Sequence, residues 1–232
     1  MGFLQLTPLE WAAVLLSLKV SFWAVFLSLP IGIFAAWTLS RMNFPGKRLL
    51  DGVIHLPLVL PPVVIGYLLL VSFGRNGVVG MYLHQAFGIT FAFKWTGAVL
   101  AASVMSFPLM VRAIRLSLDS VDQGIEAAAR TLGATPLRVF FTITLPLAFP
   151  GILTGAILAF ARSLGEFGAT IMFVSNIPGE TQTLPLALYT LTQVPNGEAG
   201  AMRLCLIAVG IAMVALVCSD VIAKRWAAKL NA

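Results

Sequence analysis

Long apolar stretches are the feature of this sequence that most restricts its fold. A helix that crosses a bilayer needs about 20 mostly apolar residues. Only 24 of the 232 residues are charged (15 Lys and Arg, 9 Asp and Glu), too few to cover a water-soluble globule of this size. The sequence therefore predicts an all-α membrane protein, a polytopic helical bundle in which residues 1–232 form a single transmembrane domain. Five stretches reach the required length: 11–39, 53–73, 96–117, 143–165 and 203–223.

A weaker apolar region covers residues 166–192. Its two halves, GATIMFVS (168–175) and LPLALYTL (184–191), are each too short to span a bilayer, and the polar, turn-rich segment NIPGETQT (176–183) separates them. We expect an outer loop flanked by short helical or re-entrant segments, with a sixth, broken span as the alternative. The predicted bundle therefore has five to six spans.

The distribution of basic residues predicts the orientation, because cytoplasmic loops are enriched in Lys and Arg. With five spans and the N-terminus outside, ten basic residues fall on the inside and three on the outside. The N-terminus is therefore predicted outside and the C-terminus in the cytoplasm. The basic residues lie dispersed at the ends of apolar stretches, which indicates membrane topology and not nucleic-acid binding. The inside residues are Arg41, Lys47, Arg48, Arg112, Arg115, Arg130, Arg138, Lys224, Arg225 and Lys229, and the outside residues are Arg75, Lys94 and Arg203.

We expect neither a metal site nor covalent chemistry on this chain. Cys205 and Cys218 are thirteen residues apart in one apolar stretch, which places them on different faces of a helix. The two histidines, His55 and His84, lie in different segments, and neither forms a recognised intramembrane catalytic motif. The pattern therefore favours a transport subunit over an intramembrane enzyme.

The longest inside loop, residues 118–142, carries the most informative local pattern. Ser120 and Gln123 fit a capping box, which predicts a helix from about Val121. Gly133 stands where that helix would end, because glycine readily adopts the left-handed conformation that closes a helix. The loop is therefore expected to contain one short helix on the cytoplasmic face.

The residues on and after this short helix predict how it connects and what it presents. Thr135 and Pro136 fit the N-cap and first position of the next helix. The alanines at 127–129 give the short helix a low surface, and Glu126 and Arg130, four residues apart, can pair along it. A small-residue helix of this kind is suited to docking into a groove on another protein.

This loop resembles the EAA loop of type I ABC importer permeases. The resemblance implies a coupling helix that inserts into a cleft on a cytoplasmic ATPase subunit. It also implies that the matching residues couple ATP hydrolysis to transport, with Glu126 and Gly133 most closely tied to that role. The positions that match the family's spacing are Glu126, Ala127, Ala128, Gly133, Ile143, Leu145 and Pro146.

Further stretches resemble the oxyanion branch of the same family, which contains permeases for molybdate, tungstate and sulfate. They are HLPLVLPPVVIGYLLL (55–70), VMSFPLMVRAIR (104–115) and FARSLGEFGATIMFVSNIPGETQTLPLALY (160–189). The compact length is more similar to molybdate permeases than to the longer sulfate permeases. The resemblance implies a permease core at about 11–222 that imports molybdate across the bacterial inner membrane by alternating access. A permease for tungstate or sulfate/thiosulfate, and an ATP-independent channel or secondary transporter, are the alternatives.

The resemblance also implies an assembly. Two copies of this chain would form a homodimer that binds two cytoplasmic ABC ATPase subunits and one periplasmic or extracellular oxyanion-binding protein, with membrane lipid around the dimer. The chain lacks a G-x-x-x-x-G-K-[ST] phosphate loop, because Gly46-Lys47 has no upstream glycine at the required spacing. ATP is therefore expected on the partner ATPase, and no cofactor on this chain.

Arg162 and Glu166 lie four residues apart at the end of the fourth apolar stretch. An isolated charge at the centre of a bilayer costs about 2.5–3.5 kcal/mol on insertion scales, so we expect these two side chains to pair or to reach water. They are candidate pathway or gate residues, and an ion pair that only fixes helix packing is the alternative.

Small residues recur every four positions in the same stretch, at Gly151, Gly155, Ala159 and Ser163. Such a stripe allows two helices to approach closely. It predicts close packing within the subunit or across a dimer, with lining of the substrate path as the alternative.

Overall fold

The computed structural model describes the backbone of residues 6–230 and the side chains of residues 6–218, 221 and 222. All regular secondary structure in this part of the chain is helical, as predicted. The elements in chain order are α1 (Pro8–Arg41), α2 (Lys47–Val59), α3 (Pro62–Phe73), α4 (Val78–Phe87), α5 (Trp95–Ser120), α6 (Gln123–Thr131), α7 (Pro136–Val139), η1 (Phe140–Thr144), α8 (Leu145–Leu164), α9 (Gly168–Val174), α10 (Leu184–Thr192) and α11 (Glu198–Leu230).

Four of the predicted spans are confirmed as long apolar helices within the described residues. They run over Pro8–Arg41, Trp95–Ser120, Pro136–Leu164 and Glu198–Cys218. The third of these joins α7, the π-helical segment η1 and α8 into one continuous helix. Because lipid offers no hydrogen-bond partners, a helix that spans a membrane must satisfy most of its backbone groups within itself.

The stretch 53–73, expected to be one span, is instead broken into α2 and α3, which meet at an angle of 115°. The break falls at Leu60 and Pro61, directly before Pro62. A proline has no N–H to donate and disfavours helical geometry at the residue before it, so two consecutive prolines end the first helix. The chain then forms α4, which the apolar pattern did not predict.

The region 166–192 forms two short helices, α9 and α10, as predicted. The segment between them is organised by its own side chains. The Thr181 hydroxyl accepts a hydrogen bond from the N–H of Ile177 (2.9 Å), and the Gln182 side chain donates to Asn176 Oδ1 (3.0 Å). The polar segment is thus a folded loop and not an extended linker.

The small-residue stripe of α8 packs against α5 within the same subunit. A Cβ added at Gly151 would lie 2.1 Å from Ser117 Cβ, and one at Gly155 would lie 3.0 Å from the carbonyl oxygen of Met110. Ala159 is fully buried. Of the two packing arrangements predicted for this stripe, the structure shows the one within the subunit.

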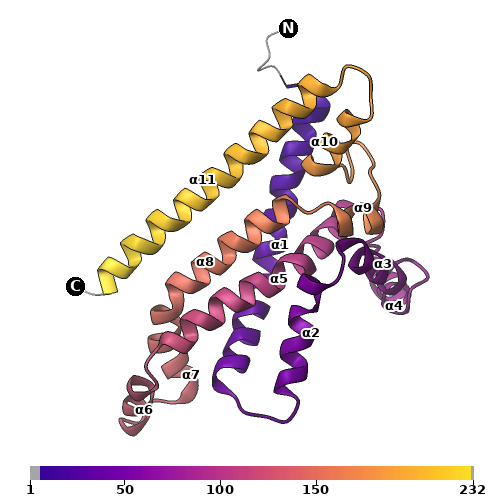
Figure 1. Ribbon diagram of the computed structural model, residues 1–232. Helices are drawn as coiled ribbons and strands as arrows, with labels where there is room; N and C mark the ends of the chain where they lie inside the picture. The colour runs from indigo at the N-terminus through magenta and orange to yellow at the C-terminus, as the bar shows by residue number, and fades with distance from the viewer. Residues whose placement is uncertain (1–5, 231–232) are drawn as a thin grey trace.

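Helix α1 covers the α5–α8 pair, and α11 lies along α8 and α10 (Figure 1). Buried apolar residues of α1, α5 and α8 form one cluster that includes Leu39, Ile114 and Ala148. Glu10 and Arg203 form an ion pair of 2.7 Å that joins the start of α1 to the start of α11. We call this end of the molecule the α10 end, and the opposite end, where α6 and the turn at 42–46 lie, the α6 end (Figure 1).

The α5–α8 contact can be tested with one added methyl group. Gly151→Ala should lower the melting temperature of the purified protein in detergent, because overpacking a tight contact costs about 1–3 kcal/mol. Gly210→Ala is the matched control, since a Cβ at this α11 position meets nothing within 4 Å. We expect it to leave the melting temperature unchanged or to raise it. Equal melting temperatures for the two variants would contradict the close contact at Gly151.

Candidate functional site

Helix α6 lies at the tip of the α6 end and begins one residue after Asp122. The Asp122 carboxylate accepts a hydrogen bond of 2.7 Å from the N–H of Gly124, so Asp122 is the N-cap. The predicted capping box at Ser120 is wrong: Ser120 is the last residue of α5, and its hydroxyl donates to the carbonyl of Ser117. An N-cap needs a non-helical backbone, and the chain leaves the helical conformation only after Ser120.

The end of α6 follows the prediction. Gly133 adopts a left-handed backbone with φ of +86°. Its N–H donates to the Arg130 carbonyl (3.0 Å), and the N–H of Ala134 donates to the Ala129 carbonyl (3.1 Å), the pair of bonds that defines a Schellman ending. Thr135 then caps α7 as predicted, accepting from the N–H of Arg138. The chain thereby reverses within four residues and re-enters the bundle.

The carboxylate of Glu126 points into the protein and not toward a docking partner. Its Oε1 atom lies 2.9 Å from Arg41 Nη2 and accepts a second hydrogen bond of 2.9 Å from the Thr144 hydroxyl. The predicted pairing with Arg130 is wrong, since Arg130 is exposed whereas the Arg41 guanidinium offers a buried charge partner. Charge-assisted bonds of this kind are stronger than those between neutral groups. We call Arg41, Glu126 and Thr144 the Glu126 clasp.

The last positions of the predicted motif surround a π-helical turn. In η1 the N–H of Leu145 bonds to the carbonyl of Phe140, five residues earlier. Pro146 follows at once, and its ring conflicts with the carbonyl four residues before it in a regular α-helix. The wider π turn removes that conflict and places Thr144, buried, beside Glu126. Ile143 is half-buried, and Leu145 packs against the apolar cluster of α1, α5 and α8.

The exposed residues of this loop include small and apolar side chains beside polar ones such as Gln123 and Thr131. Ala127 and Ala128 are exposed, and Ile125, Leu132 and Leu137 have 48%, 89% and 72% of their surface exposed. We call these five residues the docking face. Apolar side chains grouped on an exposed loop mark a surface for interaction.

Arg162 and Glu166 form the predicted ion pair, with 2.6 Å between Nη1 and Oε2. Glu166 has 2% of its side chain exposed, and its other oxygen accepts a hydrogen bond from the N–H of Ala169 (2.9 Å). Arg162 keeps 29% of its side chain exposed. The pair therefore fastens the end of α8 to the start of α9 and leaves one side of the guanidinium accessible.

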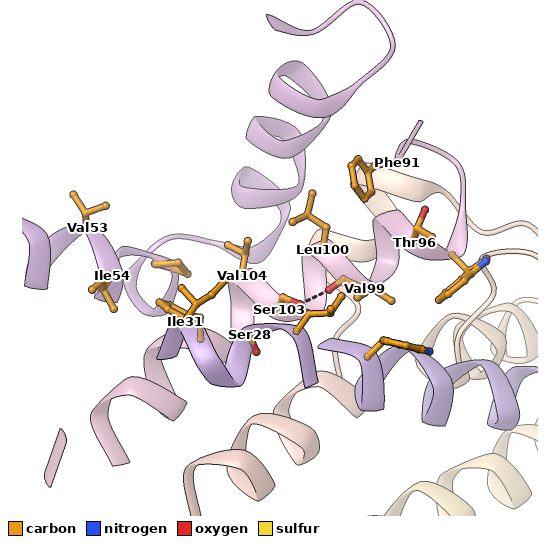
Figure 2. A pocket seen from close by; sticks show the side chains of 15 residues that line it. Ser28, Ile31, Val53, Ile54, Phe91, Thr96, Val99, Leu100, Ser103 and Val104 are labelled. Atoms are coloured by element: carbon orange, nitrogen blue, oxygen red, sulfur yellow. Dashed lines mark hydrogen bonds between the residues drawn. The ribbon is translucent and has the colours of Figure 1, made fainter. Parts of the chain in front are cut away.

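An apolar cavity of about 660 Å³ lies between α1, α2 and α5. Figure 2 shows its walls, with Ile31 from α1, Val53 and Ile54 from α2, and Val104 from α5. The Ser103 hydroxyl is already bonded to the carbonyl of Val99 (2.7 Å). Among the residues that the structure describes, no charged side chain lines this cavity, so its walls are poorly suited to holding a dianion.

A polar cavity of about 440 Å³ follows between α2 and α5, toward the α6 end. Asp51 lies 3.1 Å from Arg115 and 3.2 Å from His55, and Arg115 lies 3.8 Å from Asp119. This cluster was not predicted from the sequence, although the four-residue spacing within each helix was a usable signal. Arg41 was predicted only as a topology residue, and Thr144 was not selected.

The chain is similar in sequence to known membrane transport proteins. Residues 28–230 match the family described as "Binding-protein-dependent transport system inner membrane component". The chain is 69% identical over 219 residues to the molybdenum transport system permease protein ModB of Escherichia coli K12, covering 94% of this chain and 96% of that protein. It is 60% identical over 223 residues to ModB of Haemophilus influenzae, covering 96% and 97%.

More distant relatives share the fold. The sulfate transport system permease protein CysT of Salmonella typhimurium is 36% identical over 203 residues, covering 82% of this chain and 73% of that protein. A chain of the MetNI methionine ABC transporter in an inward-facing conformation matches with a TM-score of 0.69 at 18% identity, covering 94% of each chain. At that identity the match shows the architecture alone.

Because Glu166 is buried more deeply than Arg162, we expect the loss of Arg162 to destabilise the protein. Arg162→Met leaves the buried Glu166 carboxylate unpaired, which costs about 3–5 kcal/mol for a buried pair. It should therefore lower the melting temperature in detergent more than the double change Arg162→Met with Glu166→Gln, which removes both charges. A double variant that melts below the Arg162→Met variant would contradict this explanation, and the Glu166→Gln single variant completes the cycle that measures the coupling between the two charges.

Proposed function

Because this chain belongs to the binding-protein-dependent transport system inner membrane component family, we propose that it is the permease subunit of an ATP-driven ABC importer for molybdate. The observation that carries this proposal is the 69% identity to a molybdenum permease over 94% of the chain. Identity to the sulfate permease is 36%, which supports molybdate over sulfate. Tungstate, a dianion of the same shape, is the alternative substrate within this class.

The ATPase partner binds at the α6 end in this proposal. The docking face presents Ala127 and Ala128 between larger apolar side chains, which suits close approach to a groove. Seven residues then couple ATP hydrolysis to transport, in two ways: Ala127, Ala128, Ile143, Leu145, Pro146, Gly133 and Glu126. The alanines meet the ATPase, whereas Glu126, Gly133 and the residues around η1 set the position of α6. ATP is bound and hydrolysed on the ATPase subunit.

A second copy of this chain completes the transport path in this proposal. Helix α2 has no buried residue, and Leu49, Val53 and Val59 expose 74%, 58% and 82% of their surface. Apolar area of this kind needs either lipid or a partner subunit to cover it. Two copies would bind two ATPase subunits at the α6 end and one oxyanion-binding protein at the α10 end.

Transport then proceeds by alternating access. When the two ATPase subunits bind ATP and close together, they move the α6 helix of each permease copy. The two helical bundles then open toward the binding protein. Hydrolysis and release return them to the inward-open state. We place the Arg162–Glu166 pair at the pathway or gate, supported by the partly exposed guanidinium beside a buried carboxylate. No covalent step is assigned to this chain.

The proposal places the α6 end in the cytoplasm of a bacterial inner membrane, supported by the basic residues gathered there. In a background with Cys205 and Cys218 replaced by alanine, Glu180→Cys should react with a membrane-impermeant maleimide in intact cells. Gln123→Cys should react only after the cells are permeabilised. Labelling of Gln123→Cys in intact cells would reverse the orientation.

The function itself is tested with the complete importer in proteoliposomes. Molybdate presented with the binding protein should stimulate ATP hydrolysis, and labelled molybdate should accumulate inside only when ATP is present on the ATPase side. Tungstate should compete more strongly than sulfate at equal concentration. Uptake without ATP would indicate a channel or secondary transporter, and stronger stimulation by sulfate would move the chain to the sulfate permeases.

A further inference from the structure

Three helices meet at one carboxylate oxygen at the α6 end. Glu126 Oε1 on α6 accepts from Arg41 Nη2 at the end of α1 and from the hydroxyl of Thr144, the last residue of η1 directly before α8. Arg41 and Glu126 have only 10% and 9% of their side chains exposed, and Thr144 is buried. Removing one member of such a group deprives the others of a hydrogen-bond partner in a site that water barely enters.

The end of α1 holds the loop at two further points. Arg41 Nη2 also donates to the carbonyl of Val121 (3.2 Å), at the joint between α5 and α6. The Trp37 ring packs edge-on against Phe140, the first residue of η1, with 5.9 Å between ring centroids. The end of α1 therefore contacts the loop where it leaves α5 and where it enters α8.

The clasp lies on the opposite side of α6 from the docking face. Glu126 is buried, whereas its neighbours Ala127 and Ala128 are exposed. A partner seated on the docking face reaches the alanines and does not reach Arg41 or Thr144. Any effect of these two residues on the partner must therefore pass through the position of α6.

The segment on the other side of the clasp is a point where the helix can change register. A π turn holds one more residue than an α turn, and such turns occur often at functional sites. Thr144 is its last residue, so its bond to Glu126 fixes how η1 passes into α8. Movement of α6 is thereby linked to the start of α8 as well as to the end of α1.

From these contacts, and resting on the proposed function, we infer that Arg41 and Thr144 are positioning residues for energy coupling. Acting through Glu126, they make α6 move as one body with the ends of α1 and α8. Glu126 is in this view an internal connector, and the ATPase is contacted by the docking face. Loss of the clasp should leave the ATPase bound while its movement no longer reaches the membrane helices.

Two pairs of variants separate this role from simple support of the loop. Thr144→Val removes one hydroxyl and keeps the side-chain shape, whereas Thr144→Ser keeps the hydroxyl. Arg41→Gln removes the charged partner, and Arg48→Gln removes one positive charge from an exposed position on α2 at the same end. Each is measured in proteoliposomes with equal amounts of assembled importer, as molybdate taken up per ATP hydrolysed, together with the ATPase subunit that co-purifies.

We expect Thr144→Val and Arg41→Gln to lower uptake per ATP by about tenfold, which lies within the range of roughly 5- to 150-fold that typical couplings between sites produce. Basal hydrolysis and co-purification of the ATPase should remain. Thr144→Ser and Arg48→Gln should keep the wild-type ratio. If Arg41→Gln fails to insert, the Thr144 pair alone decides, because neither of its variants changes a charge.

Two results would overturn the inference. A wild-type ratio for Thr144→Val would show that the clasp transmits nothing. Loss of the ATPase from the Thr144→Val importer would show that the clasp only keeps the docking face folded. The wild-type importer is measured first: if molybdate fails to stimulate it, the proposed function fails, and this outcome is distinct from either result on the clasp.

Discussion

The close approach of α8 to α5 is the contact on which the rest of the bundle depends. A Cβ at Gly151 would fall 2.1 Å from Ser117 Cβ, so only a glycine permits the two helices to lie at this distance. Helix α1 packs over both, and the loop that carries α6 joins one to the other. In a membrane, where lipid tails are as apolar as the side chains, such packing and internal hydrogen bonds hold helices together. The α5–α8 contact therefore fixes where the two ends of the α6 loop begin.

In this arrangement the residues of the family motif have distinct structural roles. Gly133 provides the left-handed backbone that closes α6, and Pro146 follows the π turn that brings Thr144 to Glu126. Residues that are far apart along the motif thus build one unit, with an apolar docking face outward and a buried carboxylate inward. The motif residues therefore form a folded structural unit at the end of the bundle and not only a contact surface.

Much of the fold and part of the site were predictable from the sequence. Apolar length and the special residues Gly133, Thr135 and Pro136 act locally, so four of the five predicted spans and the end of α6 were identified correctly. The start of α6 was missed because Ser120 and Asp122 are both good caps, and the length of α5 decides between them. The partner of Glu126 was missed because Arg41 lies 85 residues away, and only tertiary packing brings the two together.

In the inferred coupling, Glu126 connects α6 to the membrane helices within the protein. The most direct measurement is a pair of cryo-electron microscopy structures of the assembled importer, without nucleotide and with ATP bound. We expect Glu126 to keep hydrogen-bond distance to Arg41 and Thr144 in both states, while α6 and the end of α1 move together relative to the second copy. A Glu126 carboxylate that leaves Arg41 and contacts the ATPase in either state would contradict the inferred coupling.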